Sequence, residues 1–81
     1  MTFDELSDYI ACGREIEFEY KQHKYSITYG ESSNGDYISF CEFYKETLDV
    51  KSAQELWNSY YHGISIKDVL LRLTPESIWL Y

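Results

Sequence analysis

The segment Glu15–Tyr20 alternates strictly between glutamate and an apolar residue. Successive side chains of a β-strand point to opposite faces, so the pattern predicts a strand with Ile16, Phe18 and Tyr20 on one face and three glutamates on the other. This one segment therefore predicts a sheet with a buried face and a solvent-facing face that carries closely spaced negative charge.

The size of the chain limits it to one domain. Its 81 residues allow a single core, so residues 1–81 are expected to fold as one unit. Aromatic residues make up 19% of the chain and include nine tyrosines. A buried aromatic ring removes roughly 150–250 Å² from water, so a few rings can anchor a small core. Several of the tyrosines are expected at the rim of that core.

Three capping signatures predict helices. In each, a serine or threonine is followed three residues later by an acidic residue and then by an amphipathic run. The pairs are Thr2 with Glu5, Ser52 with Glu55, and Ser65 with Asp68. The first predicts an N-terminal helix that stops at Gly13. The others predict a helical pair over residues 52–61 and 65–73, with Gly63 as the stop between them.

Between the first two helices the hydrophobic period changes to two. Strands are predicted over residues 15–21, 25–29 and 37–44, the second of them central. The loop before the third strand contains Asn34 and Gly35, a pair suited to the positive φ angles of a tight hairpin turn. Imperfect alternation in the third strand indicates either a bulge or two partly covered faces. Leu48 and Val50 are compatible with a brief extra strand.

The end of the third helix and the C-terminal segment complete the predicted fold. Pro75 ends the helix because proline lacks a backbone donor. The strongly apolar segment 78–81 should then dock, either as an edge strand or as a short helical turn. The order α-β-β-β-α-α predicts an α+β fold: a three-stranded antiparallel meander with one N-terminal helix and a C-terminal helical pair.

The charge balance restricts the partners. Fourteen acidic and seven basic residues give a net charge of −7. This balance disfavours direct binding to nucleic acid or to anionic membranes, and it favours a basic protein surface. Two cysteines are too few for a disulfide-rich secreted scaffold, and no segment resembles a signal peptide or a membrane span. A soluble, cytoplasmic protein is therefore expected.

No pattern indicates catalysis or a bound metal. Cys12, His23, Cys41 and His62 would supply four zinc ligands, but no pair of them has the short spacing of a zinc-binding motif. The chain contains no glycine-rich phosphate loop and no nucleophile elbow. A deep pocket is also hard to build in so small a domain. The sequence therefore predicts a protein that is not an enzyme and that holds no cofactor or metal ion.

The predicted helical pair suggests one alternative function. Two helices separated by a short turn superficially resemble the helix-turn-helix of DNA-binding regulators. The second helix, however, offers only Lys67 and Arg72 as cations, with Asp68 between them. A basic stripe supplies most of the affinity for DNA, so a plain helical hairpin is the favoured interpretation.

The acidic face of the first strand is the main functional candidate. Glu15, Glu17 and Glu19 would project at intervals of about 6.6 Å, twice the rise per residue of a strand. Glu31 and Asp36 in the hairpin loop would extend the patch. Carboxylates at regular spacing on a rigid strand can substitute for phosphates in a basic groove. The alternative interpretation is that like charges on an edge strand prevent edge-to-edge aggregation.

In size, acidity and helix–meander–helix order, the chain resembles small phage- or prophage-encoded proteins of Gram-positive bacteria. Some of these are anti-CRISPR or other anti-defence inhibitors that present acidic surfaces to nucleic-acid-binding enzymes. The resemblance is architectural and assigns no role to an individual residue. It implies a stoichiometric inhibitor.

These observations favour a non-enzymatic, acidic interaction module. Its partner would be a basic protein surface, such as the nucleic-acid-binding site of an enzyme. The predicted contact residues are Glu15, Glu17, Glu19, Glu31 and Asp36. The alternative is a self-associating scaffold domain that forms a homodimer through an aromatic C-terminal surface. That surface would consist of Trp57, Tyr60, Tyr61, Trp79 and Tyr81.

Overall fold

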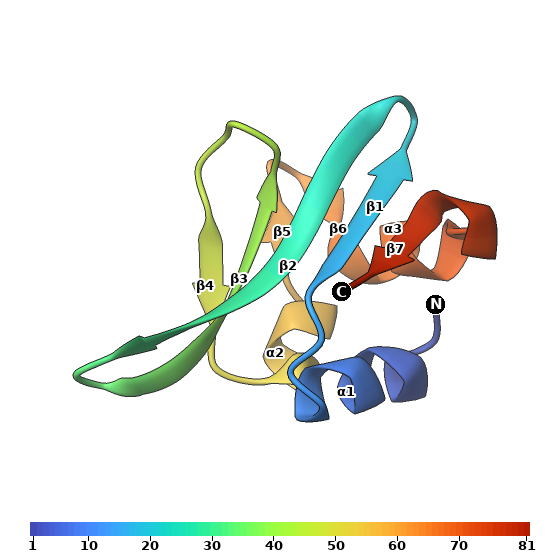
Figure 1. The fold of residues 1–81 in the computed structure, drawn as a ribbon. Coiled ribbons are helices and arrows are strands. Elements are labelled where there is room, and N and C mark those ends of the chain that lie inside the picture. Colours follow the sequence, from blue (N-terminus) through green and yellow to red (C-terminus); the bar gives the residue numbers. More distant parts are fainter.

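A computed structural model describes residues 1–81 and confirms the α+β class (Figure 1). A five-stranded antiparallel sheet is covered on one face by helices, and a separate two-stranded hairpin lies among those helices. The elements are α1 (Phe3–Ala11), β1 (Ile16–Tyr20), β2 (His23–Ser32), β3 (Gly35–Glu42), β4 (Leu48–Val50), α2 (Ala53–Trp57), β5 (Tyr60–Tyr61), β6 (Ile64–Ser65), α3 (Ile66–Arg72), the 3-10 helix η1 (Pro75–Ser77) and β7 (Ile78–Leu80).

The sheet has two more strands than the predicted meander. Its order is β4-β3-β2-β1-β7, with β2 in the centre as predicted. The C-terminal segment docks as an edge strand, because Ile78 pairs with Phe18 and Leu80 pairs with Ile16. Strand β1 is therefore an interior strand. The interpretation of the glutamates as protectors of a sheet edge is therefore wrong for Glu17 in the folded protein, whereas Glu19 lies beyond the segment that pairs with β7.

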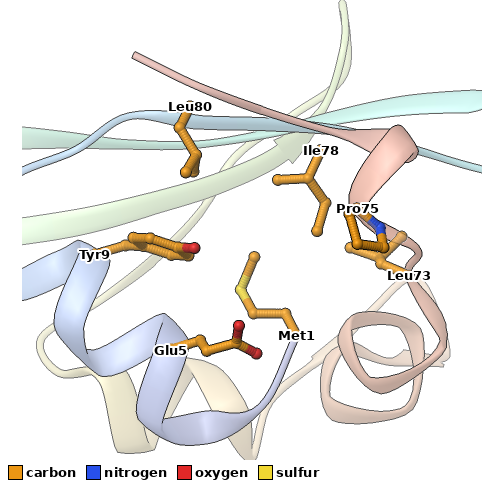
Figure 2. Close-up of a pocket in the computed structure, with 7 residues that line it drawn as sticks. All are labelled: Met1, Glu5, Tyr9, Leu73, Pro75, Ile78 and Leu80. Carbon is orange, nitrogen blue, oxygen red and sulfur yellow. The ribbon is translucent and has the colours of Figure 1, made fainter.

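The core lies between the sheet and the helices. Ile16 and Phe18 of β1 are buried on the helix side, which confirms the predicted alternation. Figure 2 shows Tyr9 of α1 facing Leu80 of β7, so the first helix packs beneath the last strand. The fully or nearly buried side chains are Leu6, Ile16, Phe18, Tyr25, Ile27, Ile38, Phe40, Val50, Leu56, Tyr61, Ile66, Val69 and Leu70.

The predicted caps are present at all three helices. Thr2 Oγ1 accepts a hydrogen bond from the Glu5 backbone N–H at 3.2 Å, and Glu5 Oε1 accepts one from the Thr2 N–H at 2.8 Å. Ser52 and Ser65 each accept a hydrogen bond from the backbone N–H three residues further on. Each side chain satisfies a donor that the helix itself leaves free, which fixes where the helix begins.

The predicted helix over residues 52–61 is wrong beyond Trp57. Strands β5 and β6 form a hairpin there, and its turn residues His62 and Gly63 have φ angles of 50° and 79°. Gly63 thus serves a tight hairpin turn rather than a helix end. Because this hairpin separates α2 from α3, the two helices do not form a helix-turn-helix.

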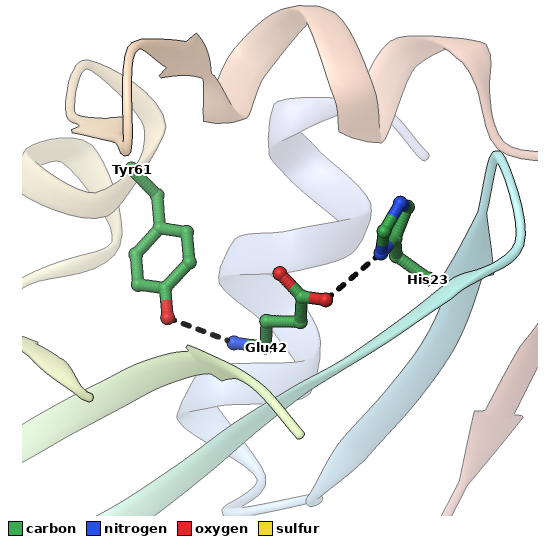
Figure 3. Close-up of polar contacts among 3 residues, drawn as sticks. All are labelled: His23, Glu42 and Tyr61. Atoms are coloured by element: carbon green, nitrogen blue, oxygen red, sulfur yellow. Dashed lines mark hydrogen bonds and ion pairs between the residues drawn. The ribbon is translucent and has the colours of Figure 1, made fainter. Parts of the chain in front are cut away.

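Tyr61 explains why the helix ends early. Its ring is buried, with its centroid 5.2 Å from that of Phe40 and 6.4 Å from that of Tyr25. Its hydroxyl group donates to the Glu46 backbone oxygen at 2.7 Å and accepts from the Glu42 N–H at 3.1 Å (Figure 3). These tertiary contacts outweigh the helical periodicity of the local sequence.

The third strand begins and ends two residues earlier than predicted. Its pairing with β2 continues without interruption from Glu42 to Gly35, so it contains no bulge. Ile38 and Phe40 are buried on one face and Tyr37, Ser39 and Cys41 are half-buried on the other, so the imperfect alternation reflects two partly covered faces. Phe43 and Tyr44 follow the strand. In the hairpin turn only Gly35 has a positive φ angle, of 104°, and Asn34 does not.

Candidate functional site: the open face of the sheet

The sheet face opposite the helices carries a mixture of charged, polar and aromatic side chains. The register places Glu17 of β1 opposite Ser26 of β2 and Trp79 of β7, so these three side chains share one face. None of the residues on this side is in the buried core. We term this surface the open face, and it consists of Glu17, Glu19, Lys24, Ser26, Thr28, Tyr37, Ser39, Cys41, Asp49 and Trp79.

The three predicted glutamates of the first strand differ in their surroundings. Glu15 precedes β1 and is exposed. Glu19 lies opposite Lys24, an opposite-charge cross-strand pair that partly compensates its charge. Glu17 has only neutral residues directly opposite it on both neighbouring strands. Two acidic residues of the open face therefore have no basic residue directly opposite them: Glu17, and Asp49 of β4, which lies opposite Ser39. Only Glu17 has aromatic neighbours from the C-terminal segment.

The structure does not bring Glu31 and Asp36 to this position. They lie opposite each other near the tip of the β2–β3 hairpin, which projects away from the helices (Figure 1). Glu31 is five residues along β2 from Ser26, the partner of Glu17, or about 17 Å at the rise of a strand. The predicted patch is thus divided into two separate acidic positions.

Two aromatic residues of the C-terminal segment lie beside Glu17. The Tyr81 hydroxyl group donates a hydrogen bond to Glu17 Oε1 at 3.3 Å, and the Tyr81 backbone N–H donates one to the backbone oxygen of Glu15 at 2.9 Å. Partial loss of hydration, and then the negative charge of Glu17, raise the pKa of the Tyr81 phenol. Trp79 lies directly opposite Glu17 and is 44% exposed.

These aromatic residues enclose a cavity of about 280 Å³. Its lining consists of Glu17, Phe18, Lys24, Phe43, Trp79 and Tyr81. Sequence reasoning did not connect Phe43 or Trp79 with the glutamates. Trp79 and Tyr81 are two residues apart, which places both side chains on one face if the segment is a strand. This spacing was the only indication in the sequence that the two rings form one surface.

The predicted aromatic C-terminal surface is not a single surface. Of its five members, only Tyr60, Trp79 and Tyr81 are exposed. Tyr61 belongs to the core, and Trp57 packs against the first helix in the helical layer. Trp79 and Tyr81 instead lie beside the acidic residues, so aromatic and acidic candidates that were considered separately occur together.

Two histidines contact glutamate carboxylates near the end of β3. His23 Nδ1 lies 2.9 Å from Glu42 Oε2 (Figure 3), and His62 Nε2 lies 2.7 Å from Glu46 Oε1. A backbone hydrogen bond and the contact with His62 lower the pKa of the Glu46 carboxyl group. The structure brings no three His, Cys, Asp or Glu side chains together at metal-binding distance.

A second hollow of about 240 Å³ lies between α1, η1 and β7 (Figure 2). Most of its lining is apolar, and the Glu5 carboxylate at its rim already accepts a hydrogen bond within the capping box of α1. This hollow therefore offers fewer free polar groups than the cavity beside Glu17.

Comparison of the chain with protein-family models, with curated proteins and with solved structures finds no match. None of the three α-helices is both long and apolar enough to cross a membrane. The fold and the site define a small α+β domain whose open sheet face is both acidic and aromatic.

Proposed function

We propose that the protein is a non-enzymatic interaction module that binds a basic surface of a partner protein through the open face of its sheet. The observation that carries this proposal is the position of Glu17, between neutral neighbours and beside exposed Trp79 and Tyr81. Aromatic residues are enriched at protein interfaces, and carboxylates supply complementarity to a basic partner.

The position of β1 within the sheet supports this function. Glu17 projects from a backbone paired on both sides, with β2 and β7, and Glu19 from a backbone paired with β2. Side chains on such a backbone lose less freedom on binding than side chains on a loop. The net charge of −7 would also steer the module towards a basic site. A nucleic-acid-binding site would suit this charge, and a module that occupies it would act as an inhibitor.

The two acidic positions would have different roles. Glu15, Glu17 and Glu19 would contact the partner together with the neighbouring aromatic rings. Glu31 and Asp36 would add contacts only with a partner that reaches the tip of the β2–β3 hairpin. This division gives the proposal a matched control within the same chain.

The experiment is an affinity capture from bacterial lysate with three tagged baits: the natural protein, the double variant Glu17→Lys/Glu19→Lys and the double variant Glu31→Lys/Asp36→Lys. Both variants change the net charge equally. We expect a basic nucleic-acid-binding protein on the natural bait and on the hairpin variant, released by salt, and none on the β1 variant. The purified partner should then lose a labelled oligonucleotide when the module is added. Equal loss of capture by both variants would contradict the proposal, because it would assign the effect to net charge alone.

A second candidate function is self-association. Strand β7 is at the end of the sheet, so one of its edges is unpaired, and the strand carries the exposed Trp79. Unpaired edges can pair with another chain. Sedimentation at increasing protein concentration tests this function, and a monomer at all concentrations would exclude it.

A further inference from the structure

We infer that the cavity between Glu17, Phe43 and Trp79 receives one arginine side chain of a basic partner. This inference rests on the proposed function and names the chemical group that the open face would take. The guanidinium group is planar, stacks on aromatic rings and presents a fork of donors to a carboxylate. The cavity offers both kinds of contact.

The lining has a carboxylate and three exposed or partly exposed aromatic rings. Trp79 lies directly opposite Glu17 in the sheet, and Phe43 and Tyr81 complete the aromatic part of the lining. The Tyr81 hydroxyl group donates a hydrogen bond to Glu17 Oε1, which orients the carboxylate. The other oxygen, Oε2, accepts no hydrogen bond from the protein. Glu17 therefore keeps acceptor capacity for a donor that enters from solvent.

The charges around the cavity agree with a cationic occupant. Glu17 forms no ion pair within the protein, and neither does Lys24, the only cation of the lining. Lys24 lies directly opposite Glu19 and two residues along β2 from Ser26, the residue opposite Glu17. Arg14 is engaged elsewhere, since its Nε donates to the Tyr81 backbone oxygen at 3.3 Å. Lys24 would compete with an incoming guanidinium group for Glu17, so its removal should favour binding.

A second copy of the chain is a poorer occupant. Each copy carries a net charge of −7, and a face-to-face dimer would bring two sets of Glu17 and Glu19 together. Like charges across an interface oppose association. The same charges favour an arginine-bearing partner.

The experiment is an NMR titration of the isotope-labelled full chain with the capped tripeptide Gly-Arg-Gly. The neutral analogue with citrulline in place of arginine is the control ligand. The indole N–H signal of Trp79 should shift in a saturable manner with the arginine peptide only. The indole signal of Trp57, which packs against Phe3 in the helical layer, should stay fixed. It is a built-in control.

Two variants test the assigned roles in opposite directions. Glu17→Gln should weaken binding of the arginine peptide by about tenfold, because a charge-assisted contact is replaced by a neutral one. Lys24→Gln should strengthen it. Unchanged dispersion of the remaining signals would show that both variants are folded.

Several results would overturn the inference. The first is an equal shift of the Trp79 signal with both peptides, and the second is a joint movement of the Trp57 and Trp79 signals. The third is a shift of the Trp79 signal when the protein is diluted without peptide, because this shift would place a second copy of the chain in the cavity. If capture of a partner requires Glu17 and Glu19 but the arginine peptide leaves Trp79 unmoved, this inference alone fails. If the peptide binds as expected and no protein partner depends on the open face, the proposed function alone fails.

Discussion

The hydroxyl oxygen of Tyr61 accepts a hydrogen bond from the backbone N–H of Glu42 at 3.1 Å, although the two residues are 19 positions apart. The same hydroxyl group donates to the Glu46 oxygen at 2.7 Å. One side chain thereby fastens the end of β3 and the loop after it to the β5–β6 hairpin (Figure 3). This link joins the sheet to the layer that covers it.

Tyr61→Phe should lower the free energy of unfolding by about 1–3 kcal/mol, because the partly buried N–H of Glu42 loses its acceptor while the ring packing remains. Urea denaturation measures this change. The matched control is Tyr60→Phe, since the exposed Tyr60 hydroxyl group makes no hydrogen bond in the protein and its loss should cost less than about 0.5 kcal/mol. Equal costs for the two variants would contradict the structural role of the Tyr61 hydroxyl group.

The pair Gly30 and Tyr37 should show energetic coupling. They are opposite each other on β2 and β3, and a Cβ atom on Gly30 would lie 2.4 Å from Cζ of the Tyr37 ring. Gly30→Ala should therefore displace this ring, at a modest cost in stability because only the far end of one side chain has to move. In the Tyr37→Ala background the same change should stabilise it by about 0.4–1 kcal/mol, because alanine reduces the entropy of the unfolded chain. A double-mutant cycle measures the coupling, and strict additivity of the two substitutions would disprove it.

Alkaline pH should weaken the fold through two tyrosines. Burial raises the pKa of Tyr25, and so does the nearby charge of Glu42. Burial also raises the pKa of Tyr29, whose hydroxyl group donates a hydrogen bond to the backbone oxygen of Arg14 at 2.7 Å. Because the folded pKa exceeds the unfolded value of 10.0, the contribution to stability is complete below pH 10 and disappears as the pH rises through the folded pKa. Urea midpoints from neutral to alkaline pH test this. Tyr29→Phe should make stability decline less steeply with rising pH. The same pH dependence in this variant and in the natural protein would show that Tyr29 is not a cause of the decline.

The cap of α2 should contribute measurably although the helix is short. Ser52 Oγ accepts from the Glu55 N–H at 3.0 Å, and the helix carries the fully buried Leu56. Ser52→Ala should cost about 1 kcal/mol of unfolding free energy, whereas Ser52→Asp should retain most of the stability, because aspartate is an equally good cap. Thermal or urea unfolding distinguishes the two. Equal stability of both variants would indicate that the backbone contacts alone fix this helix start.

The sequence predicted those features that depend on neighbouring residues. The alternation of Glu15–Tyr20 indicated correctly that Ile16 and Phe18 face the core and that the glutamates face away from it, and the capping signatures marked three helix starts. The end of α2 was not predictable in this way, because it depends on the burial of Tyr61 against Phe40. Local periodicity contains no information about such a distant contact.

The candidate site was predictable in part for the same reason. The outward position of Glu17 and Glu19 follows from strand alternation. The presence of Trp79 beside Glu17 follows from the pairing of β7 with β1, which joins residues far apart in the sequence. The separation of Glu31 and Asp36 from Glu17 likewise depends on the length of β2, which exceeds the predicted strand.

The pairing of the last strand with the first has a consequence during protein synthesis. Strand β1 leaves the ribosome before its outer neighbour, Ile78–Leu80, has been made. Until then, the growing chain presents β1 with one unpaired side, to which another nascent chain could bind. Glu17 and Glu19 would keep two such chains apart during this interval. The charges that we propose as partner contacts in the folded protein would thus also protect the growing chain.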